Sequence, residues 1–246
     1  MGTMSAYAKG RYPEIAAGGF SRRDGTIAFY QRINALLAPD ATVVDLGAGR
    51  GSSATDPVTF RRELTRIKGK VRHFVGVDID PAVLGNPRVD EAIVIGPGEN
   101  MPFADGSVDL VVSDWVLEHV RAPESFEQEV HRVLRSGGWF CARTSNALGL
   151  IGIASRVIPN RLHPWVLSHV QPDVRVREDV FPTYFRMNTK RELNRRFGKS
   201  RWETIIVPHS PEPAYHGGSA IWFEVQRWSS LPSSFSTTLL VYARKL

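Results

Sequence analysis

The 246-residue chain is short of cysteine, of long apolar runs and of any targeting pattern. Its single cysteine, Cys141, cannot form an internal disulfide, which agrees with a reducing compartment and excludes a metal cluster built on several cysteines. No apolar stretch reaches the length that spans a bilayer, and residues 1–10 contain no apolar run. We therefore expect a cytoplasmic protein without a membrane span.

The first part of the chain also lacks an excess of charge of either sign. Residues 1–150 carry 17 Lys and Arg against 18 Asp and Glu, whereas residues 151–246 carry 14 against 7, so the net charge of +6 belongs to the C-terminal part. A basic surface attracts anionic partners such as phosphate, polysaccharide or nucleic acid. Because Lys and Arg form no dense run and no RNA-binding motif is recognisable, the sequence does not favour nucleic acid as a partner.

Apolar segments of strand length alternate with segments of helical periodicity. Strands are predicted at 43–45, 72–78, 92–95, 108–113, 139–143, 202–207 and 237–243, and helices at 27–37, 57–68, 125–134, 147–158 and 189–197, with Gly137 and Gly138 ending the third of these helices. This alternation implies right-handed crossovers and a parallel sheet. The predicted fold class is α/β: a doubly wound, mostly parallel seven-stranded sheet with helices on both faces and an irregular cap after strand five.

The chain is predicted to form a single domain over residues 1–246. Residues 1–40 form an N-terminal lid and helix, residues 41–145 a cofactor-binding half, and residues 146–246 an acceptor-binding half that carries the cap. The sequence leaves open whether the protein is a monomer or a homodimer.

The most informative motif is a glycine turn, G-x-G-x-G at residues 47–51, directly after the strand that ends in Asp45. Open α/β sheets bind ligands at the carboxyl ends of their parallel strands, and glycines there let the backbone approach a ligand closely. The acid beside the turn suits a cationic ligand better than a pyrophosphate. A dinucleotide site would have G-x-G-x-x-G, and Ser52 stands where its third glycine belongs. A nicotinamide-dependent oxidoreductase is therefore the weaker alternative.

A second acid, Asp78, ends the next predicted strand, where a carboxylate accepts hydrogen bonds from ribose hydroxyls. Ile79 follows it and is placed to lie against a purine, and Asp80 before Pro81 starts the next helix. Asp78 has a purely structural alternative as a helix cap.

Four motifs in order resemble the class I S-adenosylmethionine-dependent methyltransferases, of the methyltransferase type 11 kind: residues 45–51, 75–80, 101–111 and 116–120. The resemblance covers about residues 40–145 and implies S-adenosylmethionine as cofactor. It departs from many relatives at Pro97, where they carry an acid. The cofactor contacts that it implies are Asp45, Gly47, Gly49 and Gly51 at the methionine part, Asp78 and Ile79 at the nucleoside, Glu99 and Asn100 at the adenine, and Ser113 at the sulfonium.

Methyl transfer to an alcohol calls for a base or a metal ion near the methyl group. Two candidate bases follow the fourth strand, His119 and Asp114, and Trp115 is expected to share one helix face with His119. The alternatives are packing beside the cofactor for His119 and a helix N-cap for Asp114. A divalent metal ion is compatible with the chemistry, but no metal-ligand set can be assigned from the spacing of the His, Asp and Glu residues.

The acceptor depends on residues 146–246. The segment Phe181–Thr189 combines aromatic side chains with Arg186 and an Asn-Thr pair that can cap the next helix, and it is similar to stretches in bacterial methyltransferases that look like modifiers of saccharides or envelope glycans. We therefore expect a small-molecule or glycan acceptor that is methylated on a hydroxyl. Nucleic acid and another small-molecule nitrogen or carbon acceptor remain the alternatives.

Overall fold

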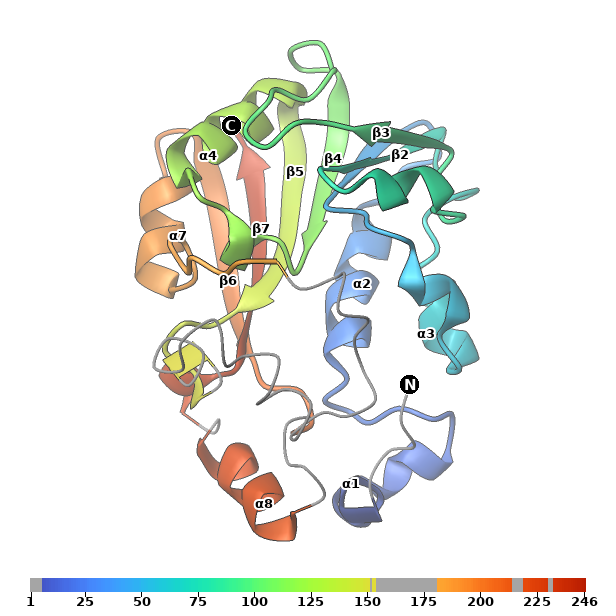
Figure 1. Ribbon diagram of the computed structural model, residues 1–246, viewed down its shortest axis with the longest axis vertical. Helices are drawn as coiled ribbons and strands as arrows, with labels where there is room; N and C mark the ends of the chain where they lie inside the picture. Colours follow the sequence, from blue (N-terminus) through green and yellow to red (C-terminus); the bar gives the residue numbers. More distant parts are fainter. Residues whose placement is uncertain (1–5, 151, 154–180, 214–218, 230–231) are drawn as a thin grey trace.

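The computed structural model describes residues 6–150, 152–153, 181–213, 219–229 and 232–246. One seven-stranded sheet runs through the molecule in the order β3-β2-β1-β4-β5-β7-β6 (Figure 1). The strands are β1 Thr42–Leu46, β2 His73–Asp78, β3 Glu91–Val94, β4 Val108–Asp114, β5 Leu134–Ser145, β6 Trp202–His209 and β7 Thr238–Lys245. The pairs among β1 to β5 are parallel, whereas β7 is antiparallel to both β5 and β6. The predicted fold class is confirmed.

Two apolar cores lie on the two faces of this sheet because successive strand residues point to opposite sides. In β1, Val43 belongs to the core on one face and Val44 to the core on the other. The same alternation separates Cys141 from its neighbours Phe140 and Ala142 in β5. Burial on both faces explains why the central strands are almost continuously apolar.

Helices cover both faces (Figure 1). Phe29 and Ile33 of one helix fill the first core, while Val130 and Leu193, from two other helices, fill the second. The α-helices are α1 Ala6–Arg11, α2 Gly25–Leu36, α3 Thr59–Leu64, α4 Pro123–Val133, α7 Lys190–Arg196 and α8 Ala220–Ser229. Short 3-10 turns are η1 Pro13–Ala16, η2 Ser52–Thr55, η3 Pro81–Gly85, η4 Leu117–His119 and η7 Ser233–Phe235. As the Asn-Thr pair predicts, Thr189 caps α7 by accepting a hydrogen bond from the backbone N–H of Glu192.

The helix predicted at 125–134 does not end at its glycine pair. Helix α4 ends at Val133, and Leu134 already begins β5. Gly137, with φ +79°, lies inside that strand, where the register with β4 shifts between Val108 and Leu110. The glycines therefore serve an irregular start of β5 rather than a helix stop.

Other boundaries also differ from the sequence prediction. The helix predicted from Pro57 to Lys68 is α3, only Thr59–Leu64, because Val58 before it has extended backbone and Thr65 caps its end. Helices α1 and α8 were not predicted. The predicted cap and most of the predicted helix at 147–158 lie outside the described residues. Within the described part of the chain, no helix combines the length and the apolarity needed to cross a membrane.

Candidate functional site

The glycine turn occupies the carboxyl end of β1. Gly47 has φ +86° and donates its N–H to the Val77 carbonyl at 2.7 Å. A Cβ on Gly47 would overlap Cγ2 of Val116, so this glycine is required by packing. Gly49 has φ +50°, and no atom lies within 4 Å of the place where its Cβ would be. The structure therefore leaves free space in front of Gly49, where a ligand can approach the backbone.

Asn86 supports this turn from behind. Its side-chain amide donates to the carbonyls of Ala48 and Gly49, at 3.0 and 3.1 Å. A Cβ on Gly51, which has φ +70°, would overlap the Asn86 side-chain oxygen. Asn86 was missed by the sequence analysis, because nothing local marks a residue that acts on a turn more than thirty positions earlier.

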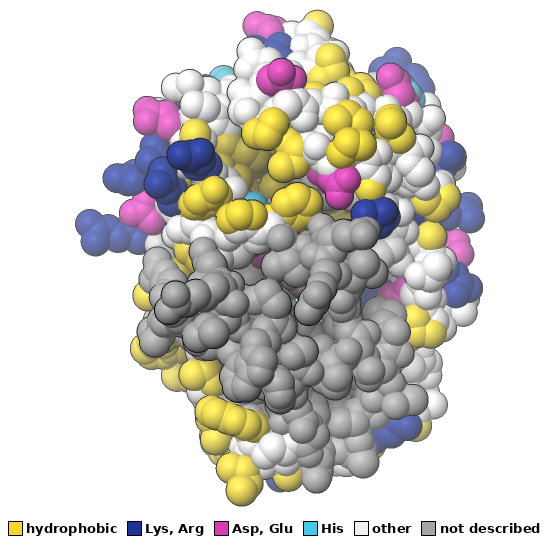
Figure 2. Space-filling model, in the orientation of Figure 1, with side chains coloured by type: hydrophobic (Ala, Val, Ile, Leu, Met, Phe, Trp, Pro, Cys, Tyr) yellow, Lys and Arg dark blue, Asp and Glu magenta, His cyan; other side chains and the backbone are white. Residues whose placement is uncertain are grey.

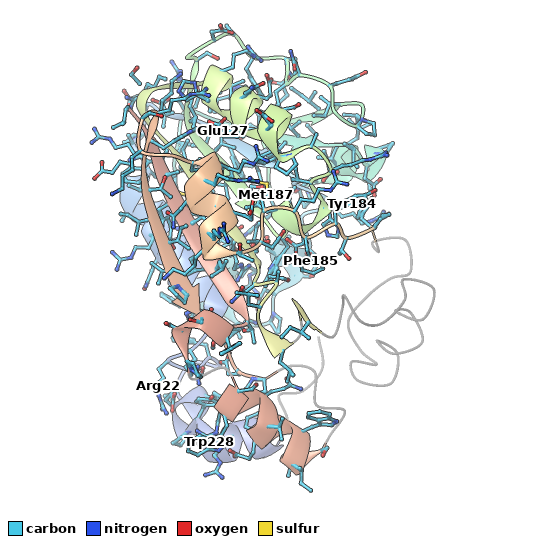
Figure 3. The ribbon with its side chains drawn as sticks, turned by 90° about the vertical axis from the view of Figure 1, so that its left-hand side faces the viewer. Arg22, Glu127, Tyr184, Phe185, Met187 and Trp228 are labelled. Carbon is cyan, nitrogen blue, oxygen red and sulfur yellow. The ribbon has the colours of Figure 1, made fainter. Side chains whose placement is uncertain are left out.

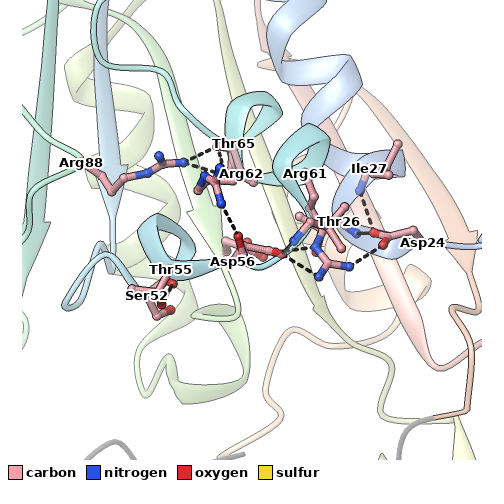
Figure 4. Close-up of polar contacts among 12 residues, drawn as sticks. Asp24, Thr26, Ile27, Ser52, Thr55, Asp56, Arg61, Arg62, Thr65 and Arg88 are labelled. Carbon is pink, nitrogen blue, oxygen red and sulfur yellow. Dashed lines mark hydrogen bonds and ion pairs between the residues drawn. The ribbon is translucent and has the colours of Figure 1, made fainter. Parts of the chain in front are cut away.

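The segment after the turn is fixed by charge. The guanidinium of Arg61 binds both Asp24, at 2.8 Å, and Asp56 (Figure 4). Asp24 also caps α2 by accepting from the N–H groups of Thr26 and Ile27. All three charged side chains are largely buried, so the network ties the loop after Gly51 to the start of α2.

Asp78 ends β2 beside the turn. One carboxylate oxygen accepts the N–H of Gly49 at 2.8 Å, and the other accepts the N–H of Asp80 at 2.9 Å. Asp78 therefore holds the glycine turn in addition to the ribose role that the sequence predicts. Asp80 starts η3 as predicted, capping the N–H of Ala82. Ile79, between the two acids, is 46% exposed and is free to meet a flat ligand.

Asp45 sits in the sheet between β2 and β4, opposite Gly76 and Val112. Withdrawal from water, together with the nearby charges of Asp114 and Asp78, raises the pKa of its carboxyl to about 7. An uncompensated carboxylate beside the glycine turn is poised to take a cationic group. This electrostatic property agrees with the sulfonium cofactor that the sequence motifs imply.

Asp114, the last residue of β4, is held by Arg143 of β5. The guanidinium meets both carboxylate oxygens, at 2.7 and 2.6 Å, and also donates to Thr26 at 3.0 Å. The hydroxyl of Tyr30 donates to the same carboxylate at 3.3 Å. Asp114 is not the N-cap of the following turn, since that position belongs to Val116. Its engagement with Arg143 favours a structural role over a base.

The chain leaves β4 through a strained residue. Trp115 has φ +63°, a conformation that a bulky side chain rarely adopts, and is followed by the three-residue turn η4. Trp115 and His119 therefore do not share a helix face, and that expectation was wrong. Nδ1 of His119 lies 2.8 Å from the carbonyl of Pro182. Since a carbonyl only accepts, Nδ1 carries the proton, and Nε2 of the neutral ring is left as a proton acceptor.

The remaining predicted cofactor residues lie in three settings. Ser113 is fully buried, and within the described part of the chain its hydroxyl has no hydrogen-bond partner. Glu99 is exposed and turns back to accept the N–H of Gly96 at 2.7 Å. Asn100 is exposed beside it. Whether these three meet a cofactor stays a prediction.

Glu118 is a site residue that the sequence analysis missed. It is buried, and its carboxylate accepts from the Thr144 hydroxyl at 2.7 Å and from the Ser145 hydroxyl at 3.4 Å. Asn188 donates to Thr144 in turn, at 2.6 Å. Burial raises the pKa of Glu118, while the bond from Thr144 opposes that rise. The only signal in the sequence was an acid inside an otherwise apolar motif.

The segment before α7 docks onto the loop that carries these residues. The backbone N–H groups of Tyr184 and Phe185 donate to the Glu118 carbonyl, at 2.8 and 3.2 Å, and Phe185 has φ +51°. Figure 3 labels Tyr184, Phe185 and Met187 along the segment that leads into α7. With the His119–Pro182 contact, these bonds bring residues 181–185 against η4. Elements far apart in the sequence thus form one wall at the ligand end of the sheet.

The described residues contain no group of three His, Cys, Asp or Glu side chains that could hold a metal ion.

Comparisons with known proteins identify the class of this site. Residues 44–142 match the family model of the methyltransferase domain. A Mycolicibacterium smegmatis protein named as an S-adenosylmethionine-dependent methyltransferase is 34% identical over 124 residues, which are 48% of this chain and 43% of that protein. The matched region spans only 36 to 43% of the first three curated relatives.

Solved structures match over the whole chain and show the fold. A Haloferax volcanii methyltransferase, solved in complex with the Trm112 methyltransferase activator, has a TM-score of 0.54 and 19% identity, with 99% of each chain covered. A Thermotoga maritima S-adenosylmethionine-dependent methyltransferase has a TM-score of 0.54 and 16% identity, with 98% of this chain and 97% of that chain covered.

The family match, the named relative and the glycine turn define one class. Residues 44–142 match the methyltransferase domain, and the relative from Mycolicibacterium smegmatis is named for its dependence on S-adenosylmethionine. These matches bear out the predicted methyltransferase class and its cofactor for residues 44–142, and they disfavour a nicotinamide-dependent enzyme.

Proposed function

We propose that the whole chain is an S-adenosylmethionine-dependent methyltransferase that methylates a hydroxyl of a small-molecule acceptor, with a saccharide or glycan as the acceptor class. In this proposal residues 1–40 are the lid, 41–145 hold the cofactor and 146–246 hold the acceptor. The observation that carries the hydroxyl assignment is the contact between His119 and Pro182, because it leaves an imidazole nitrogen as a proton acceptor at the ligand end of the sheet.

The residues of the turn fit the cofactor. The free space at Gly49 is where a cofactor approaches the backbone, and the raised pKa of Asp45 marks a carboxylate that a cationic group would stabilise. In the proposal Asp45 and the glycines hold the methionine part, Asp78 the ribose and Ile79 one adenine face, with Glu99 and Asn100 at the adenine edge and Ser113 at the sulfonium. When bound, the cofactor supplies an electrophilic methyl group.

The chain's own residues prepare the acceptor. An alcohol becomes a good nucleophile only as it loses its proton, and a positioned base contributes about 10²–10⁴-fold to the rate of such steps. His119 is the base in this proposal: Pro182 holds Nδ1–H, so Nε2 takes the hydroxyl proton. Arg143 keeps Asp114 engaged, which leaves the histidine as the better proton acceptor of the two candidates.

The saccharide assignment rests on the aromatic side chains around η4. Trp115, Phe181 and Tyr184 are each about 40% exposed, at 38, 37 and 41%, and the Phe181 ring lies 6.1 Å from the His119 ring, centroid to centroid. The guanidinium of Arg186 lies over the Tyr184 ring at 5.9 Å. Exposed rings beside a base give a sugar an apolar surface to stack on. The guanidinium of Arg186 adds hydrogen-bond donors that orient the sugar.

The test is transfer of labelled methyl from S-adenosylmethionine into fractionated small-molecule and glycan extracts of the source cell. The proposal predicts an isolable product with a methyl ether, formed by the wild-type chain and by the His73→Ala control, whose exposed imidazole lies at the start of β2. His119→Ala should form little of it. Label on nitrogen or carbon, or in a nucleic-acid fraction, would replace the hydroxyl acceptor with one of its alternatives.

A further inference from the structure

Helix α8 presents an apolar face that is largely exposed. Ile221, Trp222, Val225 and Trp228 are 80, 50, 40 and 60% exposed. Their spacing places them along one side of the helix. Hydrophobic side chains gather at the lower left of Figure 2, at the position of α8. Two exposed tryptophans on a ten-residue helix are an unusual solvent-facing surface for a soluble protein.

The opposite side of α8 is anchored. Phe223 is buried and forms a small apolar cluster with Tyr12 and Ile15, from the segment around η1. The carboxylate of Glu224 binds Arg11 of α1 at 2.6 Å. These contacts on one side of α8 leave its apolar side facing solvent. Figure 3 shows Trp228 at the same extremity of the molecule as Arg22.

The rim of this face is cationic. The charged side chains described on α1 and α8 are three positive ones, Lys9, Arg11 and Arg227, and one negative one, Glu224. Arg11 and Arg227 share the single Glu224 carboxylate, at 2.6 and 2.8 Å. The guanidinium of Arg227 also lies over the Trp228 ring, 4.8 Å from its centroid. Positive charge thus borders the apolar face itself.

We propose that α8 docks the protein on the surface of an anionic lipid bilayer, with Ile221, Trp222, Val225 and Trp228 in the interfacial layer and the basic side chains at the headgroups. Tryptophan prefers this layer because its ring is apolar and its N–H is polar, and basic residues add attraction to anionic lipids. Charge complementarity selects the occupant. A second copy would bring the same cationic rim against this one, whereas an anionic bilayer neutralises it.

The position of α8 links this surface to the site. Helix α8 connects β6 to β7, and the register of those strands places the connection at the end of the sheet where β5 finishes, with Ser145 opposite Thr238 (Figure 1). The glycine turn lies at that same end. The docking surface would therefore present the site to an acceptor with a lipid portion. This one step rests on the proposed function.

The experiment is sedimentation of the full-length chain with vesicles of phosphatidylglycerol and phosphatidylcholine, compared with pure phosphatidylcholine, at low and high salt. We expect binding to the anionic vesicles that high salt weakens, with a blue shift of tryptophan emission and quenching by brominated lipid. The paired change Trp222→Ser and Trp228→Ser should weaken vesicle binding at least tenfold. Leu246→Ser, which removes an equally exposed apolar side chain at the C-terminus, should not change it.

Binding of S-adenosylmethionine by each variant shows that it is folded and keeps this result separate from the methyl-transfer test. If the wild type bound vesicles but transferred no methyl group, the proposed function alone would be overturned. Equal vesicle binding by wild type and the tryptophan variant, or no binding to anionic vesicles, would overturn the docking proposal. So would a dimer in solution that the tryptophan changes dissociate, since the face would then belong to a second copy.

Discussion

Arg143 holds Asp114 through both carboxylate oxygens, at 2.7 and 2.6 Å, where the last residue of β4 pairs with β5. Each is the partner of the other in the strand register, so the sheet itself brings the two charges together. The pair organises the floor of the site. It also limits the chemistry of Asp114. If this carboxylate took up a proton, the ion pair with Arg143 would be lost and the buried guanidinium would have no counter-charge.

Replacing Arg143 with Met should destabilise the protein more than replacing both partners. The guanidinium is buried, and its removal leaves Asp114 without a counter-charge at a cost of about 3–5 kcal/mol. The double variant Arg143→Met with Asp114→Asn removes both charges and should recover much of that loss. Urea unfolding of the wild type, the two single variants and the double variant measures it. Additive losses in the double variant would show that the two side chains are not coupled.

Cofactor binding should weaken as the pH falls below 7. The pKa of Asp45 is raised to about 7, so at lower pH a cationic ligand must displace its proton, and the dissociation constant should rise about tenfold per pH unit. Titration calorimetry between pH 5.5 and 7.5, in buffers of different ionisation enthalpy, measures the affinity and the proton release together. Asp45→Asn should flatten the profile. A flat wild-type profile would show that the cationic group of the cofactor does not bind at Asp45.

The same shift predicts a stability effect of Asp45→Asn. Because the folded-state pKa lies above the unfolded value of about 3.9, the native protein binds the extra proton between about pH 4 and 7, and unfolding free energy falls as the pH rises through that window. At pH 8 the Asn variant should therefore be more stable than wild type by up to about 4 kcal/mol, at about 1.36 kcal/mol per pKa unit, while it binds the cofactor less well. Thermal unfolding of the cofactor-free proteins at pH 8 checks this, and a lower midpoint for the variant would contradict it.

Gly47→Ala and Gly49→Ala should fail in different ways. A methyl on Gly47 overlaps Val116, so that variant should lose stability and disturb the loop that leads to His119. A methyl on Gly49 meets no protein atom within 4 Å but projects into the space assigned to the ligand, so it should weaken cofactor binding with a smaller loss of stability. Unfolding curves and cofactor titrations of both variants make the comparison. If Gly49→Ala lost no more cofactor affinity than Gly47→Ala for the same loss of stability, a ligand role for Gly49 would be refuted.

His119→Ala should lower kcat by about 10²–10⁴-fold and leave cofactor affinity unchanged, as expected of a base that does not hold the cofactor. His119→Gln keeps a side chain of similar length, and it separates loss of the base from loss of packing against Phe181. If Gln restores turnover, the histidine acts by position rather than by taking a proton. If both variants turn over normally, it has no part in the mechanism.

The sequence was most informative where chemistry and strand order coincide. The acids and glycines after β1 and β2 could be placed because parallel strands bring their carboxyl ends to one edge, and Asp80 and Thr189 could be assigned as caps from local spacing. Contacts between distant segments could not. The support of the turn by Asn86, the burial of Glu118 behind Thr144 and the engagement of Asp114 by Arg143 depend on strand register that no local pattern encodes.

Boundaries failed for a related reason. The glycine pair after α4 is equally compatible with a helix stop and with an irregular strand start, and the pairing of β5 with β4 decides between them. Trp115 was expected on a helix face because it lies four residues before His119. Its left-handed backbone, imposed where the chain leaves β4 beneath the glycine turn, ends that pattern after one short turn.

The central claim is that the turn after β1 and the acid ending β2 together bind S-adenosylmethionine. Isothermal titration of the cofactor into wild type, Asp78→Ala and Leu246→Ser measures it directly. The claim predicts saturable one-to-one binding by wild type and by the Leu246 control. For Asp78→Ala it predicts at least a tenfold loss, since that carboxylate holds the Gly49 N–H and is proposed to bind the ribose. Absence of wild-type binding at millimolar cofactor, or full affinity in the Asp78 variant, would contradict it.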